Sequence, residues 1–402
     1  MDFDLRPVKA DEMERWATAR SRGFGQQLDR ADFEVRRSIY DLSRTVGVFD
    51  GEEVVGTSYS SAWRINVPGG SLPVAGIVAV TVQPTHRRRG ILTNMMSHQL
   101  ADVHRRGEPI AALYASESII YGRFGFGMSV MHESWSIERV HSALAMPARQ
   151  SGRVRFVTVE EMRKTFPDIQ ARALKDRPGA ILRPEWDWDR RVRWAAEPPP
   201  GFVSPFYAIY EASGAAQGYV SYMIDKGDLT VVELMSVTDE AHAALWSFVF
   251  GVDLVNVIRV QKRPVDDPLQ WMLADPRSLR RTPHDGAMGA MWTRIVDVPA
   301  ALSGRIYLRE GRLVLEVHDP FCPWNNARFA LEAGPDGAAC SQTAEAADLT
   351  LSAADLGAAY LGGVTFSTLS HAGRIEGRTP GALRRADAMF AWDLQPWCPF
   401  SY

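Results

Sequence analysis

The sequence has few cysteines. Its 402 residues include three, Cys322, Cys340 and Cys398, and these form neither a Cys-x-x-Cys pair nor a zinc-binding spacing. We therefore expect a reducing compartment, structural or incidental thiols, and no bound metal.

The sequence also lacks long apolar runs and an excess of either charge. No apolar run is long enough to cross a membrane, and the acidic start Met-Asp-Phe-Asp-Leu-Arg is unlike a secretory signal. A formal net charge of −3 indicates no polyanionic partner. We expect a cytoplasmic protein that binds neither membranes nor nucleic acid.

The chain is long enough for more than one core. A length of 402 residues predicts two or three domains, and a hydrophobic fraction of 46% is that of a soluble globular protein. Strand-length apolar runs alternate with helical spacing, which predicts an α/β (α+β) fold. We divide the chain into residues 1–145, 146–295 and 296–402.

Several local elements can be predicted within these domains. We expect a helix that begins at Asp11 with that residue as its N-cap, and a hairpin around Asp50-Gly51. We place a final strand pair of the first domain near Met131–Glu138, and further strands over Gly304–Val317.

The stretch Val80–Leu92 carries the most information. It reads Val-Thr-Val-Gln-Pro-Thr-His-Arg-Arg-Arg-Gly-Ile-Leu, and the strand must stop at Pro84, which has no N–H for the ladder. From Ile91 apolar residues recur every three or four positions, as on one helix face. The turn is therefore a helix N-terminus whose N–H groups, glycine and arginines suit a pyrophosphate. The alternatives are a solvated basic turn and a nucleic-acid patch.

A second motif follows the apolar run Ile110–Tyr114. Residues 115–125 read Ala-Ser-Glu-Ser-Ile-Ile-Tyr-Gly-Arg-Phe-Gly. With the first motif, this run resembles the Eis (enhanced intracellular survival) family of GNAT acetyltransferases, most strongly over residues 74–135. The resemblance implies two tandem GNAT-like domains, the second degenerate, then a sterol-carrier-protein-like C-terminal domain. It also implies a homohexamer.

The resemblance implies acetyl-CoA as the co-substrate. Backbone groups of Val80, Thr81 and Val82 would bind the pantetheine arm as an added strand does. The remaining predicted contacts come from the turn, the first helical residues and the second motif: Arg87, Arg88, Arg89, Gly90, Ile91, Leu92, Thr93, Ser116 and Glu117. The alternative for Glu117 is a carboxylate near a helix N-cap.

Tyr121 is the candidate acid. It matches the family tyrosine that donates a proton to the departing CoA thiolate, and a tyrosine pKa of about 10 keeps the phenol protonated at neutral pH. The alternative is a core tyrosine that packs beside Phe124 and Phe126.

Tyr402 is the candidate base, through its α-carboxylate. The tail Gln-Pro-Trp-Cys-Pro-Phe-Ser-Tyr is aromatic and proline-stiffened, so it should pack rather than fray. The resemblance implies that the carboxylate acts on the substrate amine. The usual pKa values, about 3.5 for the acid and about 10 for the amine, require a water relay or a site that lowers the amine pKa. The alternative is a tail that only closes the fold.

The acceptor is less well defined by the sequence. The family acetylates amines of aminoglycosides and other polycations in an acidic cavity, but Ser401 stands where an acid would help. Gln26 and Gln27 follow Phe24 in the loop expected at the cavity wall. The candidate acids are Asp29, Asp32 and Glu34. Three tryptophans either rim the pocket or pack between helices, namely Trp186, Trp188 and Trp194.

Residues 153–295 repeat the predicted layout of the first domain without its basic turn. The strand that ends at Val237 is followed by Thr238-Asp239-Glu240, and acid at a helix N-terminus suits capping but opposes a phosphate. We therefore predict that the second domain does not bind acetyl-CoA.

These inferences lead to one hypothesis and two alternatives. The hypothesis is an acetyl-CoA-dependent N-acetyltransferase that acetylates amines of aminoglycosides or other polyamine-like small molecules by direct transfer. No cysteine lies near the two motifs in the sequence, so we expect no acyl-cysteine intermediate. The alternatives are a protein-lysine acetyltransferase and a lipid- or ligand-binding protein with vestigial acyltransferase domains.

Overall fold

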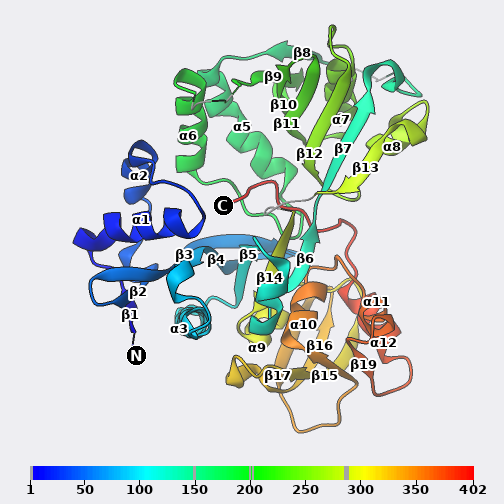
Figure 1. Ribbon diagram of the computed structural model, residues 1–402. Helices are drawn as coiled ribbons and strands as arrows, with labels where there is room; N and C mark the ends of the chain where they lie inside the picture. Colours follow the sequence, from blue (N-terminus) through cyan, green and yellow to red (C-terminus); the bar gives the residue numbers. More distant parts are fainter. Residues whose placement is uncertain (1–2, 148–150, 199–200, 202, 285–288) are drawn as a thin grey trace. The chain divides into compact units, whose positions relative to one another are not determined.

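The computed structural model describes the chain except residues 1–2, 148–150, 199–200, 202 and 285–288. The chain folds into two compact units (Figure 1). The first unit comprises residues 1–129, 291–393 and 402, and the second comprises residues 130–290 and 394–401. Each unit therefore combines segments that are far apart in the sequence.

The first unit contains a mixed sheet that has seven strands within the described residues, in the order β1-β2-β3-β4-β5-β14-β6. Its strands are β1 (Asp4–Pro7), β2 (Thr45–Asp50), β3 (Glu53–Val67), β4 (Gly70–Val82), β5 (Ile110–Tyr114), β14 (Ala290–Ile295) and β6 (Gly127–Met131). Strands β4 and β5 run parallel, and β2 and β3 form the hairpin expected around Asp50-Gly51.

Two helices, α1 (Met13–Gly23) and α3 (Ile91–Arg105), cover opposite faces of this sheet (Figure 1). Successive strand residues point to opposite faces, so Val54 packs in the cluster of α1 whereas Val55 packs in the cluster of α3. The remaining short helices of this region are η1 (Ala10–Glu12), α2 (Arg30–Arg37), η2 (Leu42–Arg44), η3 (Pro84–His86), α4 (Ser118–Tyr121) and η4 (Gly122–Phe124).

The predicted start of the first helix was wrong by a short turn. Asp11 lies inside η1, and α1 begins only at Met13 with Glu12 at its N-cap position. The carboxylate of Glu12 instead accepts a hydrogen bond from the Lys9 backbone N–H at 2.9 Å. The sequence pattern does not distinguish a short 3-10 turn at this place from the first turn of an α-helix.

The second unit contains another sheet that has seven strands among the described residues, in the order β13-β7-β12-β11-β10-β9-β8. Its strands are β13 (Arg280–Pro283), β7 (Glu133–Glu138), β12 (Val257–Arg263), β11 (Asp228–Ser236), β10 (Ala215–Asp225), β9 (Phe206–Ala212) and β8 (Arg153–Phe156). Its helices are η5 (Arg139–His141), α5 (Val159–Ala173), α6 (Glu185–Ala196), α7 (Asp239–Phe250), α8 (Leu269–Met272) and η6 (Pro276–Ser278).

The two sheets have the same layout and exchange one strand each. Strands β11 and β12 are the parallel pair of the second sheet, as β4 and β5 are of the first. However, β7 pairs with β12 and β13, while β14 pairs with β5 in the first sheet. Our placement of residues 133–138 in the first domain was therefore wrong, because sequence order does not reveal an exchange of strands.

The C-terminal part of the first unit contains a third sheet, which has five strands in the described residues in the order β17-β16-β15-β18-β19. Its strands are β15 (Gly311–His318), β16 (Ala327–Gly334), β17 (Gly337–Gln342), β18 (Leu349–Ser352) and β19 (Glu376–Gly377), and its helices are α9 (Val298–Ser303), η7 (Pro323–Asn325), α10 (Ala353–Ala359), α11 (Phe366–His371) and α12 (Ala382–Phe390). Of the region Gly304–Val317, where we expected strands, residues 304–310 form none, and β15 begins at Gly311 and pairs with β16.

The described helices are all too short or too polar to cross a bilayer.

Candidate active site

The site begins where β4 and β5 separate. Among the described residues the two parallel strands pair only over Val74–Gly76 of β4. After that point β4 contains a bulge, with Ala79 at a φ of 58°, a conformation that L-residues rarely adopt. The Thr57 hydroxyl donates to the Ala79 carbonyl at 2.7 Å and holds this bulge. The backbone of Val80–Val82 is thus turned toward the opening between the strands.

The basic turn ends in a helix N-terminus that carries no side-chain cap. Gly90 is the N-cap residue of α3, with a φ of 79° and no side-chain hydrogen bond to the first turn. Arg88 also lies in the left-handed region, at a φ of 63°. The N–H groups of the first helical turn therefore have no intrahelical or capping acceptor, and this end of the helix dipole is positive.

These elements enclose a cavity of about 430 Å³. Its lining consists of Gly23, Phe24, Val80, Thr81, Val82, His86, Arg87, Arg88, Gly90, Ile91, Leu92, Thr93, Ser116, Glu117, Ile120, Tyr121 and Arg123. The structure thus brings together the predicted cofactor residues of both motifs with the exception of Arg89, and it adds Tyr121 to the same wall. The backbone turns at Arg88, and Arg89 does not line the cavity.

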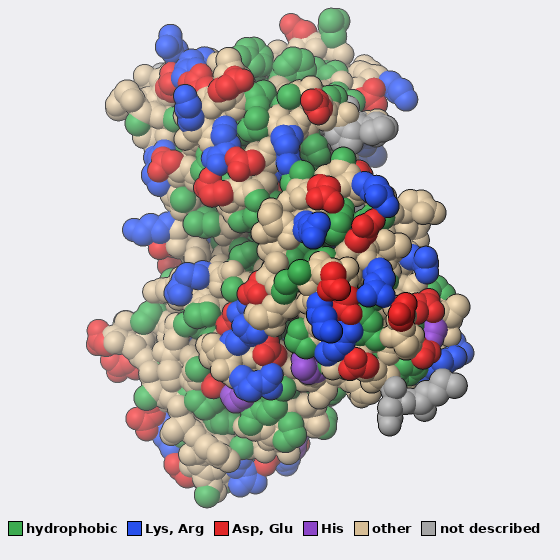
Figure 2. All heavy atoms as spheres, turned by 90° about the vertical axis from the view of Figure 1, so that its left-hand side faces the viewer, with side chains coloured by type: hydrophobic (Ala, Val, Ile, Leu, Met, Phe, Trp, Pro, Cys, Tyr) green, Lys and Arg blue, Asp and Glu red, His purple; other side chains and the backbone are tan. Residues whose placement is uncertain are grey.

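The charge of the turn is not neutralised by the protein. In the part of the chain that the structure describes, no carboxylate lies within ion-pair distance of Arg87, Arg88 or Arg89. His86 anchors the turn instead, since its Nε2 lies 3.2 Å from an Asp50 carboxylate oxygen. Figure 2, which shows the face at the left of Figure 1, has charges of both signs interspersed over that face. The exposed arginines and free N–H groups fit a bound polyphosphate.

Tyr121 lies between the cavity and the core. The residue is 9% exposed, and its ring packs edge-on against Phe126, with ring centroids 6.0 Å apart. The core packing that we considered as an alternative is therefore present together with the cavity position. Burial, with a further effect of Glu117, raises the pKa of Tyr121 to about 12. The phenol is therefore a neutral hydrogen-bond donor across the physiological range.

Glu117 does not cap the helix that follows it. It occupies the N-cap position of α4, but its side chain makes no capping hydrogen bond. The carboxylate is exposed and lines the cavity. It can therefore accept hydrogen bonds from a ligand.

The last residue of the chain, Tyr402, packs in the first unit, whereas residues 394–401 belong to the second. The Tyr402 ring contacts Trp63 of β3 and Tyr114 of β5, with centroid distances of 4.3 and 5.2 Å. Tyr114 is the last residue of β5 and directly precedes the second motif. Tyr402 does not itself line the 430 Å³ cavity.

Several lining residues were not among the predicted site residues. His86 and Arg123 lie inside the two motifs, so the motifs could have identified both as site residues. Gly23 and Phe24 come from the end of α1, and a Cβ on Gly23 would lie 2.5 Å from the Thr81 Cβ. The need for glycine at this contact depends on tertiary packing, which the sequence does not display.

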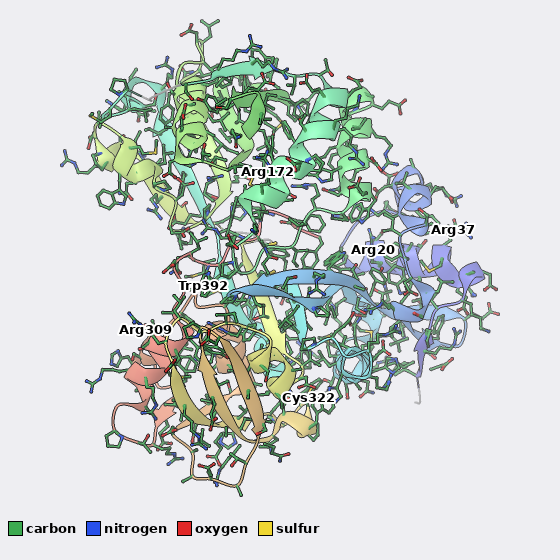
Figure 3. The ribbon with its side chains drawn as sticks, turned by 180° about the vertical axis from the view of Figure 1, so that it is seen from behind. Arg20, Arg37, Arg172, Arg309, Cys322 and Trp392 are labelled. Carbon is green, nitrogen blue, oxygen red and sulfur yellow. The ribbon has the colours of Figure 1, made fainter. Side chains whose placement is uncertain are left out.

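One cysteine lies near the second motif in the structure, although none lies near either motif in the sequence. Cys322, labelled in Figure 3, belongs to the same apolar cluster as Tyr121 and Phe124. It is 1% exposed, burial raises the pKa of its thiol, and it does not line the cavity. A buried neutral thiol is a poor nucleophile, so the cluster gives no reason to introduce an acyl-cysteine intermediate.

The candidate acids of the acceptor site are partly committed to local structure. The Asp29 carboxylate caps α2 by accepting from the N–H groups of Ala31 and Asp32. Asp32 pairs with Arg36 at 2.7 Å.

Among the three tryptophans considered for the pocket rim, Trp188 is 1% exposed and belongs to a core cluster of the second unit, which agrees with the packing alternative.

The corresponding opening in the second sheet is bridged by hydrogen bonds from side chains. Strands β11 and β12 pair over Asp228–Val231 of β11 and then separate. Beyond that point Arg263 donates to the Leu234 carbonyl at 2.7 Å, and the Trp397 indole N–H donates to the Lys262 carbonyl at 2.7 Å. The N-terminus of α7 is capped by the Thr238 side chain, which accepts from the Ala241 N–H.

The comparisons with known proteins agree with this architecture. Models of the acetyltransferase (GNAT) domain match residues 4–129 and 179–295, and a sterol carrier protein domain matches residues 298–399. An uncharacterized N-acetyltransferase of Streptomyces avermitilis is 36% identical over the full length of both chains. The N-acetyltransferase Eis of Mycobacterium tuberculosis is 38% identical, with 89% of this chain and 88% of the relative covered.

A solved structure supports the same assignment. The crystal structure of Eis1 from Mycobacterium abscessus matches with a TM-score of 0.86 and 32% identity, covering 99% of this chain and 100% of that one. The protein is therefore a GNAT acetyltransferase with two tandem GNAT domains and a sterol-carrier-like C-terminal domain. More specifically, the chain belongs to the Eis family of N-acetyltransferases.

Proposed function

We propose that the protein transfers the acetyl group of acetyl-CoA to an amine of a small molecule by direct transfer. The observation that carries this proposal is the single cavity in which the uncapped N-terminus of α3, the bulged end of β4 and Tyr121 meet. Arg87, Arg88 and the N–H groups that follow Gly90 would hold the phosphates, and the backbone of Val80–Val82 would hold the pantetheine arm.

The proposed chemical step forms an amide bond and breaks the thioester bond of acetyl-CoA. The neutral amine nitrogen attacks the thioester carbonyl carbon, the C–S bond breaks and the sulfur leaves as a thiolate, while the nitrogen loses one proton to water as the amide forms. Tyr121 would donate a hydrogen bond to that sulfur. Because the pKa of Tyr121 is about 12 and that of a thiol is about 8.5, complete transfer of the phenolic proton is uphill. We therefore assign the stabilisation of the thiolate to the hydrogen bond, with the final proton coming from solvent.

The Tyr402 α-carboxylate is the proposed base for the amine. The packing of the Tyr402 ring against Trp63 and Tyr114 supports an ordered end of the chain beside the end of β5. A carboxylate is a weak base toward an ammonium, so the proton would pass through water or the site would lower the amine pKa.

The remaining assignments are proposals by resemblance. They are amines of aminoglycosides or other polyamine-like molecules as acceptors, a homohexamer, and three domains divided near residues 145 and 295. Strands β7 and β14 depart from that division, because each pairs in the sheet of the other GNAT domain.

The test measures CoA release with a panel of aminoglycosides, polyamines and lysine-containing peptides. The native chain is compared with a chain that carries one additional glycine after Tyr402, and acetyl-CoA binding is measured separately for both. Turnover by the native chain alone, with equal acetyl-CoA binding, supports the terminal-carboxylate mechanism. Equal turnover by both chains would assign the base elsewhere, and activity restricted to peptides would favour a protein-lysine acetyltransferase.

A further inference from the structure

A fully buried ion pair lies next to the second motif, and the proposed reaction does not use it. Arg294 of β14 donates through Nη2 to a carboxylate oxygen of Asp319, which follows β15. The two residues are 0% and 1% exposed. Both belong to the first unit, and neither lines the 430 Å³ cavity.

The surroundings of the pair fix the position of the Arg294 guanidinium. Its Nε and Nη1 have no hydrogen-bond partner within the described residues, so the bond to Asp319 determines where the group lies. The Asp319 carboxylate also accepts from the Cys322 backbone N–H at 3.0 Å and from the Asn325 amide at 3.3 Å. Asn325 donates as well to the carbonyl of Val296, at 3.0 Å. The loop that carries Asp319 is therefore tied to the end of β14.

The Arg294 guanidinium lies directly against the turn that follows Tyr121. A Cβ on Gly125 would lie 2.1 Å from Arg294 Nη1 and 2.6 Å from its Cζ, so only glycine fits there. Gly125 has a φ of 80°, and the next N–H along the chain, that of Phe126, donates to the Tyr121 carbonyl at 3.3 Å. One hydrogen bond therefore joins the backbone of Tyr121 to the residue that follows this contact.

The C-terminal domain makes further contacts with the same part of the motif. Asp319 and Phe321 both lie within the residues that match the sterol carrier protein domain. The Phe321 ring packs against Phe124, with ring centroids 4.9 Å apart. A Cβ on Gly127 would lie 1.9 Å from the Ala354 carbonyl oxygen of α10. The end of the second motif is thus packed on side chains and backbone of another domain.

A pair of buried charges gives little net stability. The desolvation of both groups offsets much of their attraction, and replacing such a pair by well-packed apolar side chains is often neutral or stabilising. A charged pair does define one arrangement, whereas several apolar packings can have similar free energies. The ion pair therefore suits the positioning of the turn at Gly125 better than the stabilisation of the core.

We propose that Arg294 and Asp319 are positioning residues, which hold the Tyr121 phenol at the reacting sulfur through the turn at Gly125. This inference rests on the proposed acetyl transfer and on the role of Tyr121 in it. The exchanged strand β14 supplies one of the two residues, and the sterol-carrier-like domain supplies the other. Both segments thereby set the geometry of the first GNAT site.

The test replaces the charged pair by a neutral one in the full-length protein. Arg294→Met/Asp319→Asn removes both charges and keeps an oxygen acceptor at residue 319. We expect kcat for CoA release to fall about tenfold, because a small misplacement of a reacting group is costly, while the Kd for acetyl-CoA is unchanged. In a Tyr121→Phe background the same replacement should lower kcat no further, because the phenol to be positioned is absent.

Two further variants complete this comparison. Arg294→Lys keeps the charge but lacks the planar group that lies against Gly125, so it should also lower kcat, and it decides the question if the neutral pair prevents folding. Arg44→Met/Glu108→Gln neutralises another buried ion pair of the first unit and should leave kcat unchanged.

A second readout does not depend on acetyl transfer. Tyrosine labelled with carbon-13 at the ζ position reports ionisation of the phenol by NMR, and the Tyr121 signal is identified by its absence in Tyr121→Phe. Burial raises the pKa of Tyr121 to about 12 in the native protein. In Arg294→Met/Asp319→Asn a displaced, less buried ring should have a pKa closer to the ordinary value of about 10.

Three outcomes would overturn the proposal. They are a kcat that the neutral pair leaves unchanged, a Tyr121 pKa that it leaves unchanged, and an equal further loss of kcat in the Tyr121→Phe background. Absence of CoA release by the native protein with every amine would instead contradict the proposed acetyl transfer. The NMR comparison would then still decide whether the ion pair positions the phenol.

Discussion

In both GNAT sheets of this protein the two parallel strands separate at the corresponding place, but the residues at the two openings differ. In the first sheet the opening between β4 and β5 leads to an uncapped helix N-terminus, glycine and exposed arginines. In the second sheet the opening between β11 and β12 is bridged by Arg263 and Trp397, and the helix N-terminus is capped by Thr238. The same backbone layout thus offers hydrogen-bond donors to a ligand in one copy and satisfies them internally in the other.

The difference lies in a few side chains rather than in the fold. Gly90 stands at the N-cap of α3, while Thr238 stands at the N-cap of α7. The first turn of α7 also contains Asp239 and Glu240, which would repel a phosphate. The comparison therefore supports our prediction that the second domain does not bind acetyl-CoA. Substitutions at either opening can test it.

The largest effect should come from removing the Trp397 side chain, which bonds to the Lys262 carbonyl at the second opening. Trp397 is 6% exposed and packs in a core cluster of the second unit. Trp397→Ala should lower the free energy of unfolding by about 3–5 kcal/mol, measured by urea denaturation. Trp271→Ala is the matched control, since Trp271 is 76% exposed. Equal midpoints for the two variants would show that the tail does not stabilise the second unit.

The next effect concerns the phenol at the first opening. Tyr121→Phe should lower kcat by about 10²–10³-fold because a hydrogen-bond donor positioned at the developing negative charge contributes that much, while acetyl-CoA binding persists. Tyr222→Phe removes the hydroxyl of another buried tyrosine, which lies in the second unit, and should leave kcat unchanged. An active Tyr121→Phe enzyme would reduce Tyr121 to a packing residue.

A smaller effect is expected at the glycine of the basic turn. Gly90→Ala puts a Cβ at a φ of 79° in the cavity wall, and we expect the Kd for acetyl-CoA to rise about tenfold, equal to about 1.4 kcal/mol. Gly107→Ala is the control, because Gly107 has a φ of 70° and open space but does not line the cavity. Should both variants bind acetyl-CoA as the native protein does, the turn would not be the phosphate site.

The corresponding change at the second helix should affect stability alone. Thr238→Ala removes the hydrogen bond to the Ala241 N–H and should cost about 1 kcal/mol, measured by thermal unfolding. Thr238→Ser keeps the cap and should be nearly neutral. A change in acetyl-CoA affinity in Thr238→Ala would mean that the second opening takes part in binding.

The smallest expected effect is an absence of pH dependence. Since the pKa of folded Tyr121 is raised to about 12 and the protonated phenol is the acting form, its contribution is complete at pH 7 and is lost only as the pH approaches 12. The profile of kcat/KM should therefore show no alkaline limb from this group up to about pH 10. A limb near pH 10 in the native protein that is missing in Tyr121→Phe would contradict the raised pKa.

The sequence predicted the first opening better than the second. Both motifs of the first opening are continuous, and their residue types follow directly from helix-terminus chemistry at Gly90 and from the strand end at Pro84. The second opening is bridged by contacts among residues distant in the chain, such as Trp397 with Lys262. The same limitation explains Gly23 against Thr81 and Cys322 beside Tyr121, where packing rather than local pattern brings the residues together.

The exchanged strand β14 has a consequence for synthesis of the chain. Residues 290–295 lie between β5 and β6, one strand from the edge of the first sheet, although β6 ends at Met131. The ribosome must therefore translate most of the second GNAT domain before the first sheet can close. Until then the nascent first GNAT domain lacks an interior strand and exposes the edge of β5, and its sheet is completed only by slow, long-range pairing.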